Sequence, residues 1–285
     1  MKIVKKPLIL ACMALPILAF SAETEKTHSS IAAASVAPAA ASVDKGALAK
    51  QAQNPLASMI SLPFQTNTNF NIGPDNDTNN ILYVQPVIPI DYNEDWNIIQ
   101  RTILPVITQP DIITGDGTKT GIGNTQVVAY FSPKEPYHGI VWGVSPVLML
   151  PASNTDFGSK EWGYGLSAVA LAMPGKWVFG GLLTQLWAPS GDNSAQINST
   201  AFQYFINYNL DDGWYLTTTP TMTYNSRSVP GERWTVPLGG GVGKVFHWGK
   251  QAINFRVIGY KNVVKPTANS ADLTLQMQFT LMFPK

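Results

Sequence analysis

The segment that most constrains the fold is the last one, residues 272–285, in which apolar and polar side chains alternate almost to the end. The apolar side chains on one side are Leu273, Leu275, Met277, Phe279, Leu281 and Phe283. Threonines and glutamines lie between them, and a period of two predicts a β-strand with one apolar face and one uncharged polar face. Because about 9–11 tilted residues of this kind cross a lipid bilayer, the segment predicts a strand of a transmembrane β-barrel.

The distribution of charge agrees with a surface covered by lipid. Charged residues make up 13% of the chain, against roughly 25% in soluble domains. Every Asp and Glu after residue 53 lies in an expected loop or turn, or in the first residue or two of a strand, as the cost of a charge facing lipid demands. A secreted β-sandwich is the alternative all-β fold, but its strands are shorter and its outer face carries more charge.

The N-terminal residues 1–21 predict a secretory signal peptide. Lysines precede an apolar run over residues 7–20, and small residues lie before Ala22, where a signal peptidase would cut. The run is shorter than the roughly 20 residues that a membrane-spanning helix needs. Cys12 is the only cysteine, so we expect a mature chain without disulfide bonds.

Residues 22–53 predict a periplasmic linker, because they are rich in alanine and serine and poor in large apolar side chains. Within them, residues 42–53 have two open interpretations. One is a short helix that stops at Asn54-Pro55 and lies in or under the barrel. The other is disorder. The barrel itself is expected over residues 54–285.

The barrel segment divides into about twelve long extended stretches, separated alternately by short turns and longer loops. We expect strands over residues 60–70, 80–90, 96–108, 121–131, 139–150, 162–172, 177–187, 199–210, 214–225, 233–246, 251–263 and 272–283. The predicted fold is therefore an antiparallel, up-and-down transmembrane β-barrel. An even number of strands leaves both ends of the chain on the same side, as bacterial barrels require.

The tryptophans support these boundaries, because all eight fall at or beside an expected strand end. Near the short turns are Trp96, Trp142, Trp177, Trp214 and Trp248; near the loops are Trp162, Trp187 and Trp234. Aromatic side chains gather at both lipid interfaces of membrane barrels. We therefore expect two tryptophan belts.

Seven segments carry a resemblance to a known family. They are residues 54–65, 85–89, 96–105, 121–126, 142–151, 234–244 and 283–285. These segments are similar to the outer-membrane proteins of the MetA-pathway of phenol degradation family, whose bacterial members are often labelled transporters. The resemblance implies an outer-membrane barrel and a transport function. Because the family's link to phenol breakdown comes from gene context, it implies aromatic solutes only as a candidate class.

Strand alternation also predicts the side chains that line the interior. If Leu216 and Phe202 face lipid, their neighbours in sequence face inward, and the interior is neutral and rich in hydroxyl and amide groups. The substrate-binding candidates are Arg101, Arg256, Gln203, Asn207, Tyr215 and Asn254. No acid accompanies the two mid-strand arginines, which either contact a solute or bond groups inside the barrel.

These features predict a bacterial outer-membrane channel for passive uptake of small neutral or weakly anionic solutes, aromatic compounds included. The alternative is a non-conducting structural or surface-recognition barrel. The expected partners are outer-membrane lipid and lipopolysaccharide, the solute, and the barrel-assembly machinery, whose insertion signal the aromatic Phe283 near the C-terminus resembles. We expect a monomer that binds no nucleic acid.

We expect no enzymatic activity, no metal site and no cofactor. An outer-membrane phospholipase needs a histidine within reach of a nucleophile at the lipid interface. The three histidines, His28, His138 and His247, lie in the linker and in two expected turns, where nothing brings them together. The same scatter argues against a metal site, which needs clustered ligands.

Overall fold

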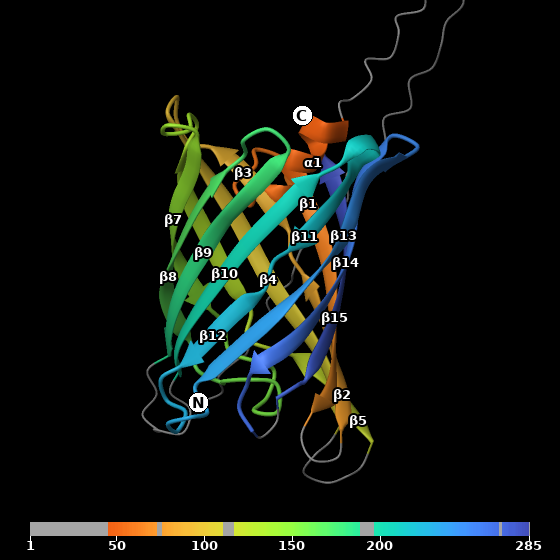
Figure 1. Ribbon diagram of the computed structural model, residues 1–285. Coiled ribbons are helices and arrows are strands. Elements are labelled where there is room, and N and C mark those ends of the chain that lie inside the picture. The colour runs from red at the N-terminus through yellow and green to blue at the C-terminus, as the bar shows by residue number, and fades with distance from the viewer. Residues whose placement is uncertain (1–44, 73–75, 111–116, 189–196, 268–269, 285) are drawn as a thin grey trace, which may run out of the picture. The chain divides into compact units, whose positions relative to one another are not determined.

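The computed structural model describes residues 45–72, 76–110, 117–188, 197–267 and 270–284 (Figure 1). The chain divides into two compact units, residues 1–42 and 43–285. The first unit, with the predicted signal peptide and most of the predicted linker, lies outside the described residues. The second unit is described below.

The second unit contains one α-helix, one short 3₁₀ helix and fifteen strands among the described residues. The elements are α1 (Lys45–Gln53), β1 (Ile60–Ile72), β2 (Asp77–Val84), β3 (Val87–Asp91), β4 (Trp96–Pro110), β5 (Thr118–Ile122), β6 (Gln126–Pro133), β7 (Ile140–Met149), β8 (Gly163–Ala172), β9 (Trp177–Ala188), β10 (Ile197–Asn209), η2 (Asp211–Gly213), β11 (Trp214–Thr218), β12 (Thr221–Asn225), β13 (Trp234–Trp248), β14 (Gln251–Val264) and β15 (Leu273–Phe283).

The strands form one closed antiparallel barrel of twelve strands. The count is twelve because β2 with β3, β5 with β6, and β11 with β12 each occupy one position in the wall: both members of each pair contact the same neighbouring strand. The first and last strands, β1 and β15, pair from Ile60 with Phe283 to Phe70 with Leu273, which closes the barrel. The predicted fold class is confirmed.

Proline accounts for two of the three interruptions, which the sequence analysis did not predict. The sequence predicts continuous strands over residues 80–90, 121–131 and 214–225. The first and last of these are broken at Pro86 and Pro220, because proline has no N–H to donate to the ladder. Another difference is the turn expected at residues 247–250. Trp248 still pairs with Gln251, which leaves a two-residue turn with Gly249 at a φ of 60°.

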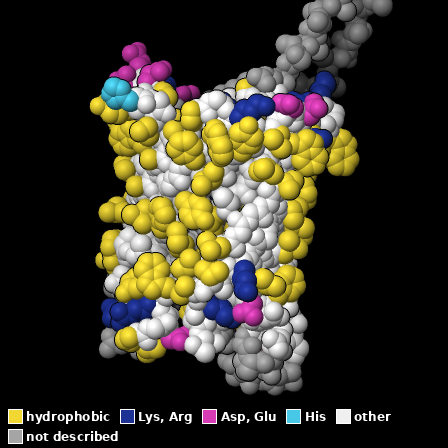
Figure 2. All heavy atoms as spheres, in the orientation of Figure 1, with side chains coloured by type: hydrophobic (Ala, Val, Ile, Leu, Met, Phe, Trp, Pro, Cys, Tyr) yellow, Lys and Arg dark blue, Asp and Glu magenta, His cyan; other side chains and the backbone are white. Residues whose placement is uncertain are grey.

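The outer wall is apolar, and charge gathers mainly toward the two ends of the barrel (Figure 2). We call these the turn end, where the short connections lie, and the loop end. Large apolar side chains such as Leu166, Leu183 and Leu216 are 49–63% exposed on the wall. All eight tryptophans lie within or next to the first or last three residues of a strand, as predicted. An apolar wall between aromatic ends suits a lipid bilayer.

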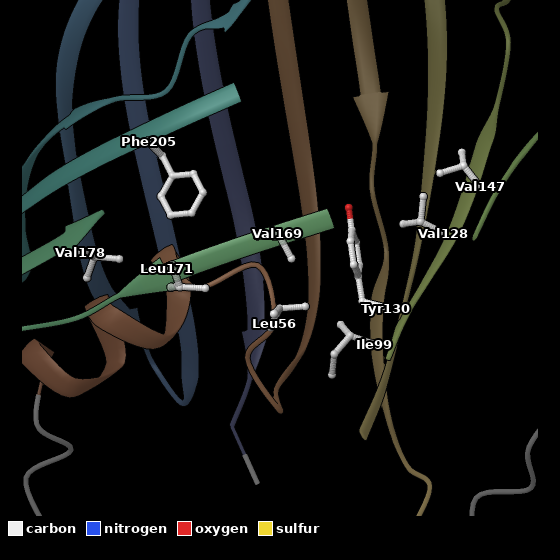
Figure 3. Close-up of a cluster of buried hydrophobic side chains, with 9 residues drawn as sticks. All are labelled: Leu56, Ile99, Val128, Tyr130, Val147, Val169, Leu171, Val178 and Phe205. Atoms are coloured by element: carbon white, nitrogen blue, oxygen red, sulfur yellow. The ribbon is translucent and has the colours of Figure 1, made fainter. Parts of the chain in front are cut away.

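Part of the interior is apolar, which corrects the prediction of a uniformly polar lining. A cluster of buried side chains from β4 and β6 to β10 packs around Leu56, from the segment between α1 and β1 (Figure 3). Its members are Leu56, Ile99, Val128, Tyr130, Val147, Val169, Leu171, Val178 and Phe205. Strands such as β7 and β8 are apolar on both faces, so alternation gave no sign of this cluster.

The helix α1 packs inside the turn end of the barrel. Its buried Leu48 and Ala49 join a second cluster with Met59, Tyr215, Val245, Ala252 and Met282. The last four of these belong to β11, β13, β14 and β15, at residues near the short turns. The structure has a helix at residues 45–53, within the range 42–53 where the sequence left a helix and disorder open; residues 42–44 lie outside the described residues. None of the helices among the described residues is long and apolar enough to cross a membrane.

Candidate functional site

A cavity lies inside the barrel, bordered by the segment that runs from α1 into β1. About 140 Å³ of it is available to the centres of water-sized molecules. Residues 51–55, Ala57 and Met59 form one side, and the other lining residues come from β1, β3, β4, β9, β10, β11, β14 and β15, with Thr219 from the gap between β11 and β12. All six predicted binding residues line this cavity: Arg101, Arg256, Gln203, Asn207, Tyr215 and Asn254. Strand alternation thus predicted their location, while their role in binding stays a prediction.

Arg101 lines the cavity from β4, and its hydrogen-bond partner lies in the interruption between β2 and β3. Its Nη2 donates a hydrogen bond to Oε1 of Gln85. Gln85 lies between β2 and Pro86, is 4% exposed, and donates its own N–H to the carbonyl of Pro63 at 2.9 Å. The Nε of Arg101 is buried and has no hydrogen-bond partner among the described residues. The guanidinium is therefore held by a neutral amide.

Arg256 has a matching environment on β14. Its Nη2 donates to Oε1 of Gln278 at 2.7 Å, and Gln278 is its register partner on β15. The Nε of Arg256 is likewise buried without a partner in the part of the chain that is described. Both arginines thus bond a glutamine side chain. Each arginine therefore bonds a group inside the barrel. That bond uses only one of the five N–H donors of its guanidinium.

Tyr215 and Asn254 form a bridge over β13. The register places Tyr215 opposite Gly243, and Gly243 opposite Arg256, which is two residues from Asn254 on β14. The Tyr215 hydroxyl donates to Oδ1 of Asn254 at 2.7 Å. A Cβ on Gly243 would lie 2.1 Å from Cζ of Tyr215, so only glycine leaves room for the ring. The bridge fixes the wall beside Arg256.

Two amide side chains on β10, Gln203 and Asn207, line the same cavity and differ in their hydrogen bonds. Gln203 donates from Nε2 to the carbonyl of Thr219 at 3.1 Å, a residue that lies in the gap before Pro220. Asn207 donates from Nδ2 to the carbonyl of Val178 at 3.4 Å. The Oδ1 of Asn207 is buried and has no donor among the described residues. The wall beside the cavity therefore contains a buried, unsatisfied acceptor.

The charge of the cavity is positive. Its lining contains Arg101 and Arg256 and no Asp or Glu among the described residues. Both guanidinium groups belong to residues that line this one cavity. Buried charges in proteins are normally paired with an opposite charge. Two positive charges without an acidic partner, in a partly desolvated space, favour the entry of an anion.

The end of α1 borders the cavity and is bonded to β10. Gln53 Nε2 donates to Asn209 Oδ1 at 2.8 Å, and Asn209 Nδ2 donates to Gln53 Oε1 at 3.2 Å. Asn209 also donates to the carbonyl of Lys176 in the neighbouring turn, at 3.1 Å. Together with the apolar contacts of Leu48, these bonds hold the helix in the barrel mouth.

At the loop end, residues 151–161 pack against the inner face of β5, a feature that the sequence analysis missed. A Cβ on Gly121 would lie 2.1 Å from Cε2 of the buried Phe157. Asn124 holds the segment with three bonds: Nδ2 donates to the carbonyls of Leu150 (3.0 Å) and Ser159 (2.8 Å), and Oδ1 accepts from the Ser159 N–H (2.9 Å). The only sequence signal was a glycine, Gly121, in an otherwise ordinary strand.

The histidines give no sign of catalysis where the structure describes them. His138 lies in the turn before β7 with a φ of 49°, and His247 lies near the end of β13. Within the described ranges, no group of three His, Cys, Asp or Glu side chains could hold a metal ion. His28 lies outside the described residues. The absence of enzymatic activity stays a prediction.

Comparison with known proteins identifies the fold but no family. No protein-family model and no curated protein matches the sequence, so the resemblance to the phenol-degradation family stays a prediction. Among solved structures, the chain is similar to the COG4313 outer membrane channel from Pseudomonas putida F1, with a TM-score of 0.62, 14% identity, and coverage of 79% of this chain and 95% of that one. The NanC porin, at 10% identity, covers 79% of this chain and 100% of its own with a TM-score of 0.48. The fold is that of a bacterial outer-membrane β-barrel.

Proposed function

We propose that the chain is an outer-membrane channel for passive uptake of small neutral or weakly anionic solutes, with moderately apolar and aromatic compounds as the candidate class. The observation that carries this proposal is the cavity inside the barrel, which contains two arginines and no acid among the described residues. The COG4313 protein of similar fold is itself named an outer membrane channel. Loops would face the outside, and the turns and α1 the periplasm.

The lining supports a mixed solute preference. Arg101 and Arg256 attract negative charge, and the cavity offers amide and hydroxyl groups from Gln203, Asn207 and Tyr215. Leu182 and Phe205 supply apolar surface on one side of the same cavity. A twelve-stranded barrel has a narrower interior than the 16-to-18-stranded porins with open aqueous channels. We therefore expect selective passage of small solutes.

Planar-bilayer recording tests the proposal. In a salt gradient, the parent barrel should show discrete conductance and a reversal potential that reports anion selectivity. Arg101→Ala and Arg256→Ala should each reduce that selectivity, because each removes a cavity charge. Lys244→Ala is the matched control: Lys244 lies over the Trp214 ring, 4.6 Å from its centroid, outside the cavity lining. Unchanged selectivity in both arginine variants would contradict the proposal.

The second candidate is a non-conducting structural or surface-recognition barrel. Two observations favour it: α1 packs inside the turn end, and Phe157 packs inside the wall near the loop end. Deletion of residues 22–53 separates the candidates. A channel should gain conductance when α1 is removed, whereas silence after this deletion, with no uptake defect in a strain that lacks the gene, would support the structural role.

We further propose a monomer in contact with outer-membrane lipid and lipopolysaccharide, inserted by the barrel-assembly machinery. The exposed apolar wall supports the lipid contact (Figure 2). Semi-native electrophoresis tests the folded state, because a folded barrel migrates differently when it is not heated. Recovery as a soluble periplasmic protein would contradict this assignment.

A further inference from the structure

We propose that the cavity is a saturable binding site for a small organic carboxylate that also carries a hydroxyl group. This inference deepens the proposed function, since it names the solute class and predicts that the solute binds during passage. It rests on three features of the cavity: the unused donors of the two arginines, the unsatisfied acceptor on β10, and the apolar part of the lining.

The arginines supply the donors. Each guanidinium has five N–H donors, and the described residues accept one bond from each, to Gln85 and to Gln278. The Nε of each is buried without a partner. A carboxylate accepts two parallel bonds from a guanidinium, in a geometry that a single-atom anion cannot match. The partners present are neutral, so the charges of Arg101 and Arg256 remain free to pair with a solute.

Asn207 supplies the acceptor. Asn207 is one of the residues that line the cavity, and its Oδ1 is buried and receives no hydrogen bond from the described residues. A buried acceptor without a donor costs about 1–3 kcal/mol. A solute hydroxyl would satisfy it. A carboxylate alone has no proton to donate here, and this is why the site favours a hydroxy acid over the corresponding simple acid.

The size of the cavity and its apolar surface restrict the body of the solute. One water-sized group needs about 10–15 Å³ of such volume, so the 140 Å³ available hold on the order of ten non-hydrogen groups. Leu182 and Phe205 lie in the lining near Asn207 on the same pair of strands. A compact apolar body that joins the carboxylate to the hydroxyl fits these surroundings.

Equilibrium dialysis of the detergent-purified chain against 4-hydroxybenzoate tests the inference, with benzoate and phenol as probes that each lack one group. The parent should bind 4-hydroxybenzoate saturably and each analogue at least tenfold more weakly. Equal binding of all three, or no saturable binding of 4-hydroxybenzoate, would overturn the inference.

Isosteric variants identify the site. In Gln278→Glu, an internal carboxylate pairs with Arg256 and should weaken binding of 4-hydroxybenzoate at least tenfold; Gln85→Glu should do the same at Arg101. Gln185→Glu is the matched control: it adds the same carboxylate at a glutamine outside the cavity lining and should change binding less than threefold. If neither Gln278→Glu nor Gln85→Glu weakens binding, the assignment of the binding site to this cavity is overturned. Heat-modified migration on gels confirms that each variant is folded.

Conductance of the same preparation separates this inference from the proposed function. Saturable binding of 4-hydroxybenzoate without any conductance would overturn the channel and leave the site. Conductance without saturable binding would overturn the site and leave the channel.

Discussion

The ring of Tyr215 occupies the space that a side chain on Gly243 would need, and its hydroxyl donates to Asn254 on the far side of β13 at 2.7 Å. Because Tyr215 also packs against the cluster that contains Leu48 and Ala49, the same ring links the wall beside Arg256 to the helix in the barrel mouth. A change at this position should therefore alter both stability and the seating of α1.

Gly243→Ala should lower the free energy of unfolding by about 1–3 kcal/mol, because the new methyl group overpacks the Tyr215 ring. Gly240→Ala is the matched control on the same strand: its nearest contact would be the Thr217 carbonyl oxygen at 3.4 Å, an ordinary distance. Urea titration of each variant barrel in lipid vesicles measures its free energy of unfolding. Equal stability of the two variants would show that Tyr215 can move aside freely.

Ala49→Asp should release α1 from the barrel, because it buries an unpaired carboxylate in an apolar cluster. Ala49 is 1% exposed, whereas Ala47, on the same helix, is exposed. Ala47→Asp is therefore the control. Trypsin cleavage after Lys50 reports release of the helix, and it should be faster in Ala49→Asp than in the parent and Ala47→Asp. Equal rates in all three would mean that the seating of the helix does not depend on the buried position.

The sequence predicted the strands well because lipid and interior alternate along each of them, as in β15, whose Gln276 and Thr280 are buried while Met277 is 39% exposed. The prediction of inward-facing side chains failed where that alternation is absent. Val169 and Leu171 of β8 face inward although the strand reads as apolar throughout. The predicted up-and-down order already made the strands of Tyr215 and Gly243 neighbours, but their apposition could not be predicted, because it depends on the register between β11 and β13.

The contact between Glu232 and Thr267 should make the loop end sensitive to acid. Glu232 accepts bonds from the Thr267 N–H and, at 2.5 Å, from its hydroxyl. These bonds lower the pKa of Glu232 below its ordinary value. A carboxylate whose pKa is lower in the folded state stabilises that state above its unfolded pKa, about 4.3, and the stabilisation is lost as the pH falls through the folded pKa.

Amide hydrogen exchange at Thr267, measured by NMR as a function of pH, checks this expectation. Protection at Thr267, relative to the intrinsic rate, should fall below about pH 4.3. Asp272 is a second titrating group nearby, since its bond with Lys265 lowers its pKa as well. Glu232→Gln separates the two: this variant should lose the pH dependence if Glu232 causes it, and a pH dependence that survives would point to Asp272.

The tryptophans should lie in two belts near the membrane surfaces. Trp177, Trp214 and Trp248 are exposed at the turn end, and Trp162 and Trp234 are exposed at the loop end. Brominated lipids with labels at different depths measure their position. Labels near the headgroups should quench the fluorescence most strongly. Strongest quenching from the centre of the bilayer would contradict the proposed position of the membrane.

Asn124 should control how far residues 151–161 obstruct the loop end. Its side chain makes the three bonds to Leu150 and Ser159 described above, and Phe157 on the same segment packs over Gly121. Asn124→Ala removes all three bonds and leaves the carbonyl groups to water. We expect a looser segment, and therefore larger and noisier single-channel conductance if the pore runs past Phe157.

The matched control for this last change is Asn154→Ala. Asn154 accepts a bond from the Asp156 N–H at 2.9 Å within the segment itself, so its loss leaves the attachment to β5 and β6 in place. Conductance should then stay close to that of the parent. If Asn154→Ala and Asn124→Ala changed conductance equally, local order in the segment would matter more than its anchoring. If neither changed it, the conducting path would not pass Phe157, and the constriction would have to be sought at α1.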